Sequence, residues 1–260
     1  MDLDMISVGT GLPDPRTAEA LAEKAEALVT SFRATIGNLS EAVTAARERF
    51  ETQHSSIVPP GVPKSQVQGI VGAVKAAVDR DLRAFTTDLL KNSEKDRTEQ
   101  LRQAKSHADA LAALVHVYPN PAAYLSGTTV ADARRAQYVA ALAHAGPAEL
   151  STYARQALAT NDRALAAAVV SRNDSLPKES RLFPSLDFAA KFVGAEHEGL
   201  TRAAKRADAA LQAMLLANRQ LERGGRPDST GRIALGLRQQ AASAQPTDTD
   251  AIGRAMPGRR

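Results

Sequence analysis

The strongest constraint on the fold of this chain is the spacing of its apolar residues over three long stretches. The stretches run from Leu21 to Phe50, from Val67 to Leu89 and from Val193 to Leu221, and in each the apolar residues recur at steps of three and four. Such steps place the apolar side chains on one face of an α-helix, so each stretch predicts a long helix with a single apolar stripe. A protein built from such helices works by presenting helix faces.

The first two stretches predict a long helical hairpin over residues 16–118. A first helix, from near Arg16 to about Gln53, is followed by prolines at positions 59, 60 and 63, which cannot continue a helix and predict an extended loop. Ser65 and Gln68 have the spacing of a capping box for the second helix. Because the two stripes have similar lengths and a stiff connector joins them, an antiparallel hairpin is the simplest arrangement.

The second helix is predicted to break between Lys91 and Gln100. This stretch contains no strongly apolar residue, and the stripe resumes only at Leu101. A new helix start at Ser93, with Asp96 three residues later, is the favoured reading. The alternative is one continuous helix with a solvated stretch.

Residues 119–184 lack a long apolar stripe and contain closely spaced helix starts and stops, which predict a compact bundle of short helices. Thr129, with Asp132 three residues later, starts a helix that ends at Gly146. Pro147 suits the first turn of the next helix, and Asp162 caps a third helix that ends near Arg172. The second and third of these helices, with an Asn-Asp turn between them, resemble one tetratricopeptide-type helix pair. No second copy follows at the expected period, so the pattern indicates a generic antiparallel helix pair.

Residues 185–224 predict one long C-terminal helix, which is capped by Ser185 and stopped by Gly224 and Gly225. Its regular stripe has two readings: a coiled-coil seam between copies of the chain, or packing within one subunit onto the middle helices. In a seam, Asn218 would be the polar residue that fixes the register. The candidate seam residues are Leu200, Ala207, Leu211, Met214, Asn218 and Leu221.

Two arms flank the helical regions: an N-terminal arm over residues 1–15 and a basic tail over residues 225–260. The composition of the tail predicts disorder in isolation, except for a short amphipathic piece. The tail contains no aromatic residue, so it offers no stacking platform for single-stranded nucleic acid. As a docking arm, its candidate interaction residues are Arg232, Ile233, Leu235, Leu237 and Arg238.

No part of the chain has the pattern of a catalytic site. Cysteine is absent, which excludes disulfides and thiolate chemistry, and the five histidines are scattered without the three- or four-residue spacing of a metal site. There is no nucleophile or phosphate-loop motif. We therefore predict a non-enzyme with no metal and no cofactor. The longest apolar run, Ala164 to Val170, is too short to span a bilayer, so no membrane span is expected and the chain is predicted to be cytoplasmic.

Extended termini, long alanine-rich helices and the absence of cysteine make the chain resemble the helical virion-associated proteins of tailed bacteriophages. The resemblance implies an all-α structural or assembly protein, with a scaffolding, minor capsid, neck or ejection role, in a virion assembled in the host cytoplasm. Its partners would be copies of itself, as a homo-oligomer, or other structural proteins of a large assembly. Two alternatives stay open: a bacterial helical adaptor that binds a protein or peptide through its middle helix pairs, and a nucleic-acid-associated protein that uses the Arg-rich tail.

Overall fold

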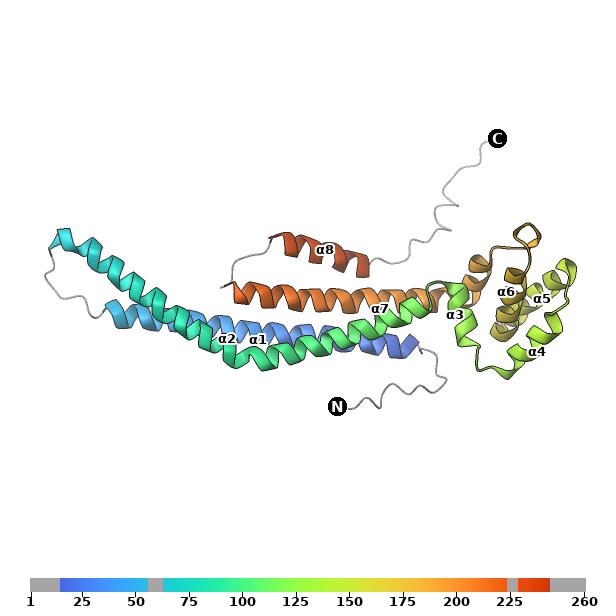
Figure 1. Cartoon of the computed structure of the whole chain (residues 1–260), viewed down its shortest axis with the longest axis horizontal. Coiled ribbons are helices and arrows are strands. Elements are labelled where there is room, and N and C mark those ends of the chain that lie inside the picture. The colour runs from blue at the N-terminus through green and yellow to red at the C-terminus, as the bar shows by residue number, and fades with distance from the viewer. Residues whose placement is uncertain (1–14, 56–62, 224–228, 244–260) are drawn as a thin grey trace, which may run out of the picture. The chain divides into compact units, whose positions relative to one another are not determined.

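The computed structural model describes residues 15–55, 63–223 and 229–243, and every regular element in these ranges is helical (Figure 1). The all-α class predicted from the sequence is confirmed. The predicted loop after the first helix and the outer parts of both arms lie outside the described residues. The elements are α1 (Pro15–Ser55), α2 (Lys64–Val117), α3 (Pro121–Thr128), α4 (Ala133–Leu142), α5 (Pro147–Thr160), α6 (Arg163–Ser175), a short 3-10 helix (Lys178–Ser180), α7 (Ser185–Glu222) and α8 (Ser229–Ser243).

The chain divides into two compact units, each of which is described by itself. The described residues of the first unit are 15–23, 108–207 and 239–243, and those of the second unit are 24–107, 208–223 and 229–238. The first unit therefore holds α3 to α6 together with the first part of α7. The second unit holds most of the two long N-terminal helices.

The second unit confirms the predicted long hairpin of α1 and α2. Phe32 of α1 shares a fully buried cluster with Ala104 of α2 and Met214 of α7, whereas Phe50 of α1 contacts Phe85 of α2 edge to face, with ring centroids 6.3 Å apart. The partner's number falls as the α1 number rises, so the two helices are antiparallel. The stripes of the hairpin and of α7 thus form one core, because each helix alone would leave its apolar face in water.

The second long helix, α2, continues through the stretch between Lys91 and Gln100, so the predicted break is wrong. Arg97 takes the inward position, only 4% exposed, and its guanidinium donates to Asn218 Oδ1 and to the carbonyl of Leu90 at 3.0 Å. Ser93, the predicted helix start, instead accepts from Arg97 Nε at 3.2 Å and donates to the Leu90 carbonyl. Because these hydrogen bonds satisfy the buried cation, a polar residue lies on the inner face without ending the helix.

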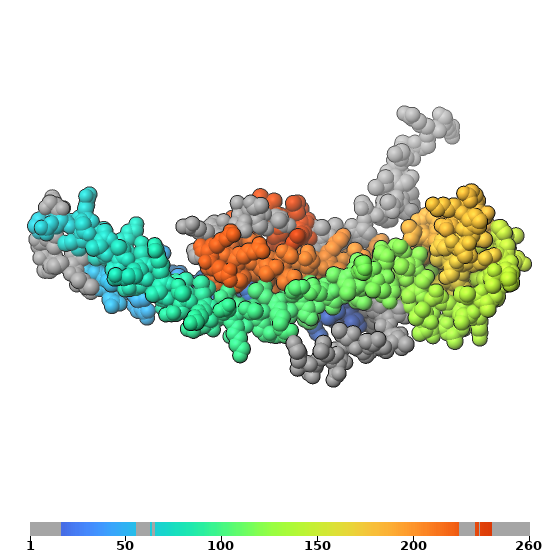
Figure 2. Space-filling view, viewed as in Figure 1, coloured from blue at the N-terminus to red at the C-terminus, as the bar shows by residue number. Residues whose placement is uncertain are grey.

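The first unit is built around α6. Every residue from Ala164 to Val170 is buried, and α3, α4 and α5 pack against this helix. The space-filling view shows the residues of α3 to α6, green to yellow, closely packed together (Figure 2). The short apolar run in the sequence is therefore a helix that is covered on all sides by its neighbours.

Local signals account for most of the helix boundaries in the first unit. Asp162 accepts from the backbone N–H groups of Ala164 and Leu165, as predicted. Asp132 caps α4, so the predicted helix start at Thr129 is wrong: Thr129 is the buried C-cap residue of α3, and its hydroxyl donates to the carbonyl of Leu125 at 2.9 Å. The α4 helix ends at Leu142 instead of Gly146. Helix α3 was not predicted, although Asn120 caps it and a proline follows the cap, which is a standard helix start.

Ser185 does not serve as the predicted cap of α7, because it is itself the first residue of that helix. Its hydroxyl accepts from Asn173 Nδ2 at 3.0 Å and donates to Asp174 Oδ1 at 2.7 Å. The fully buried Asn173 also accepts from the backbone N–H of Leu182 and donates to the carbonyl of Phe183. These bonds fix the connection between α6 and α7 on the first unit.

Candidate peptide-binding groove

The predicted seam on α7 is covered within a single chain. Its residues are buried or half-buried: Leu200, Ala207, Leu211, Met214, Asn218 and Leu221. In the second unit, Leu211 packs against the cluster around Phe32, and Asn218 accepts its hydrogen bond from Arg97 of the same chain. The stripe therefore packs internally, but in the second unit it meets the long hairpin and not the middle helices.

The candidate residues of the basic tail lie in α8, where the predicted amphipathic piece is helical. Ile233 and Leu237 are exposed, Leu235 is half-buried, and Arg232 is exposed. Arg238 forms a long ion pair with Asp208 of α7, with 3.9 Å between Nε and Oδ2. An exposed pair of this kind contributes little stability, and these contacts alone indicate no particular ligand.

The first unit carries an open groove of 390 Å³ between α5, the connection before α7 and the first turns of α7. Residues from all three segments line it: Ser151, Ala154, Arg155, Leu158, Leu182, Phe183, Pro184, Asp187, Phe188 and Lys191. The connection is held by Asn173 as described above, so the groove has fixed walls on both sides. A preformed hollow of this size suits one or a few side chains of a bound segment.

The floor of the groove is apolar and partly open to solvent. Leu158 is 41% exposed and Leu182 is 40% exposed, although both are large aliphatic residues. Phe183 stacks on Phe188 with ring centroids 4.6 Å apart, and Phe188 contacts Phe192 on the next turn of α7. A rigid aromatic base with exposed leucines at its edge is the composition of a protein-docking surface.

The charges at the groove are mainly positive. Arg155 on α5 and Lys191 on α7 line it, and the single carboxylate in the lining is that of Asp187. Arg155 donates only a long hydrogen bond, 3.4 Å, to the carbonyl of Ser151. Neither cation has an ion-pair partner among the described residues. An acidic segment bound in the groove could therefore form ion pairs with both Arg155 and Lys191.

Sequence reasoning did not find this groove. The available signal was Leu182-Phe183, an apolar pair between Arg181 and Pro184 in a connection that is otherwise polar. Leu158 gave a second hint, since it lies away from the buried positions Ala154 and Ala157 of α5. Neither pattern shows by itself that the two segments meet, because they are far apart along the chain.

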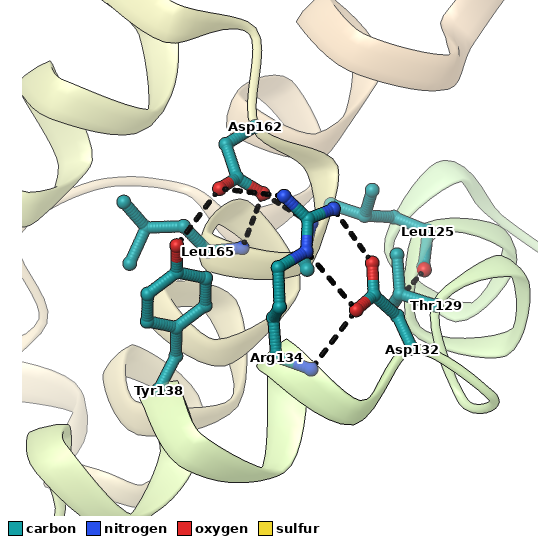
Figure 3. Close-up of polar contacts among 8 residues, drawn as sticks. Leu125, Thr129, Asp132, Arg134, Tyr138, Asp162 and Leu165 are labelled. Atoms are coloured by element: carbon teal, nitrogen blue, oxygen red, sulfur yellow. Dashed lines mark hydrogen bonds and ion pairs between the residues drawn. The ribbon is translucent and has the colours of Figure 1, made fainter.

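A polar cluster joins the starts of α4 and α6 on the same unit (Figure 3). Asp162 accepts from Tyr138 Oη at 3.0 Å and lies 3.7 Å from an Arg134 guanidinium nitrogen, while Arg134 also pairs with Asp132 at 2.8 Å. The hydrogen bond from the Arg134 side chain lowers the pKa of Asp132, and the bond to Asp162 raises the pKa of Tyr138. Each carboxylate also caps a helix, so the cluster fastens two helix starts together and presents no free nucleophile.

Replacing Asp132 by asparagine should reduce the acid sensitivity of the first unit. The lowered pKa means that the ionised carboxylate stabilises the fold above its unfolded pKa of about 3.9, and that this contribution is lost as the pH falls through the lower folded pKa. Asparagine keeps the cap but not the charge. Denaturant titrations at about pH 6 and pH 2 should show a smaller loss of stability for the variant than for the wild type. If both proteins lost the same amount of stability, the Asp132 charge would not be what stabilises the fold at neutral pH.

No metal site or membrane span is found in the described part of the chain. Within those ranges no three histidine, aspartate or glutamate side chains are grouped so that they could hold a metal ion. No helix in the same ranges combines the length and apolar character needed to cross a bilayer. Family models, curated proteins and solved structures were compared with the chain, and none matched. The function is therefore inferred from the residues.

Proposed function

We propose that this protein is a non-enzymatic assembly protein that docks on other structural proteins of a larger particle. The observation that supports the proposal is the groove of the first unit, where Leu158 and Leu182 are exposed over a fixed aromatic base. Exposed apolar side chains that gather over one hollow are typical of a surface that a partner covers. The contact that attaches the protein is this groove, and not the seam of α7.

The particle is proposed to be the virion of a tailed bacteriophage, with assembly in the host cytoplasm. The support is the resemblance of the sequence to helical virion-associated proteins, together with helix lengths of 41 residues for α1 and 54 residues for α2. At 1.5 Å per residue these helices extend about 60 Å and 80 Å, which suits proteins that bridge or line a large assembly.

A helical adaptor that binds a cellular protein is the second candidate. It is supported by the position of the groove on α5, one of the two helices that resemble a tetratricopeptide-type pair. The nucleic-acid reading has less support, because Arg238 of α8 is already paired with Asp208 and the tail has no aromatic residue.

The test separates the particles from cells that produce this protein on a density gradient. The amount of the chain in each fraction is measured by quantitative mass spectrometry. Leu158→Asp would place a carboxylate in the apolar groove and is expected to reduce association with particles by about tenfold or more. Val139→Asp is the matched control, since Val139 is 44% exposed on α4 and lies outside the groove. This control should co-sediment like the wild type, and both variants should keep the helical circular dichroism signal.

Recovery of the wild-type chain only in low-mass fractions would contradict the particle assignment. If the low-mass chain then bound one cellular protein and Leu158→Asp abolished that binding, the adaptor would be the correct class. Equal behaviour of Leu158→Asp and Val139→Asp would contradict the role of the groove in either class.

A further inference from the structure

We propose that the groove of the first unit binds residues 2–8 of the same chain. The inference rests on the proposed function, because it takes the groove to be a peptide-binding site, and it names the segment that fills it. Before assembly, the segment would cover the exposed leucines of the groove, and a partner protein would have to displace it.

The chemistry of the segment complements that of the groove. Residues 2–8 read Asp-Leu-Asp-Met-Ile-Ser-Val, with two carboxylates, four large apolar residues and no cation. In an extended peptide, alternate residues face opposite sides, so Leu3 and Met5 share one side while Asp2 and Asp4 share the other with Ile6 and Val8. Two of the four apolar residues, Leu3 and Met5, would therefore face the groove. An apolar side against the leucine and phenylalanine floor leaves the carboxylates toward the rim of the groove.

The rim supplies matching charge. Arg155 and Lys191 line the groove from two different helices, α5 and α7, and neither has an ion-pair partner among the described residues. Charge complementarity of this kind selects one orientation and disfavours basic segments. The tail past residue 243 is unsuited by this criterion, because it ends in the basic sequence Gly-Arg-Arg and is poor in large apolar residues.

The segment is also long enough to reach the groove. In the first unit, Glu19 of α1 pairs with Arg206 of α7, which places the start of α1 beside that helix. Along α7, Arg206 and Lys191 are about 23 Å apart, and Glu19 and Pro15 add at most about 6 Å. The ten residues from Met5 to Pro15 extend up to about 33 Å, which exceeds this distance. The N-terminal segment can therefore reach the groove of its own chain, without a second copy.

Cysteine cross-linking in the full-length chain tests the proposal, because the natural sequence contains no cysteine. The test variant carries Met5→Cys with Leu158→Cys, and the matched control carries Met5→Cys with Val139→Cys. Both partner positions are similarly exposed, at 41% and 44%, and lie on helices of the first unit. Disulfide formation under mild oxidation is followed by mass spectrometry of the linked peptides and by non-reducing electrophoresis.

A docked segment should let the test variant form its disulfide at least about tenfold faster than the control variant forms its own, in a product of monomer mass. Adding Asp2→Lys and Asp4→Lys should remove most of that difference, because the segment would then carry the sign of the rim. Equal rates for the two variants, or a product of twice the monomer mass, would overturn the proposal. Loss of particle association in Leu158→Asp would in that case still support the proposed function, so the two failures are distinguishable.

Discussion

Replacing Phe32 by alanine is expected to lower the free energy of unfolding of the second unit by about 3–5 kcal/mol. Phe32 is fully buried against Ala104 and Met214, so the truncation removes apolar contacts and leaves a cavity in the core shared by α1, α2 and α7. The measurement is urea denaturation followed by circular dichroism. Val71→Ala is the control, since Val71 is exposed on α2, and it should change stability by less than about 0.5 kcal/mol.

Repeating the Phe32→Ala measurement at two protein concentrations separates internal packing from a seam between copies. If α7 packs within one chain, the midpoints of the wild type and the variant should not move with concentration. A midpoint that rises with concentration would show that the stripe is shared between chains and would contradict the internal core.

Replacing Asn218 by leucine is expected to cost about 1–3 kcal/mol, although the substitution adds an apolar side chain to a largely apolar helix face. The buried Arg97 guanidinium would lose its acceptor on α7, while the remaining carboxylate nearby, that of Glu222, lies 3.6 Å away and is half-exposed. Arg97 keeps its bonds to Leu90 and Ser93, but the donor that Asn218 accepted from would stay buried without an acceptor, which costs more than the hydrogen bond contributes. Urea denaturation gives the measurement, with Arg102→Met as a control in an exposed pair with Glu99.

The double variant Arg97→Met with Asn218→Leu should recover much of the stability that Asn218→Leu loses. Replacing both partners with apolar side chains leaves no orphaned donor and lets the stripe continue through the predicted break. A double variant as unstable as the sum of the two single variants would show that Arg97 and Asn218 do not act as a pair.

The groove illustrates what a single sequence leaves open. Asp162 could be predicted as a cap, because a cap acts on backbone groups two or three residues away. Leu158 and Leu182 could not be joined into one site in the same way. They line one groove because the bonds of Asn173 hold the connection before α7 in place on the first unit, and no local pattern specifies such an arrangement.

The sequence by itself determined the helical class, the long hairpin and most helix starts and stops, because apolar periodicity and capping residues act within a few turns. The tertiary structure alone decided which partner covers each stripe. A periodic pattern defines an apolar face but not its occupant, so the α7 stripe was equally compatible with a second copy and with the middle helices, whereas in the second unit it packs on the hairpin. Arg97 is the clearest case: it lies in the apolar-poor stretch that predicted a break in α2, and Asn218, a partner 121 residues away, joins Leu90 and Ser93 in satisfying its buried guanidinium within an unbroken helix.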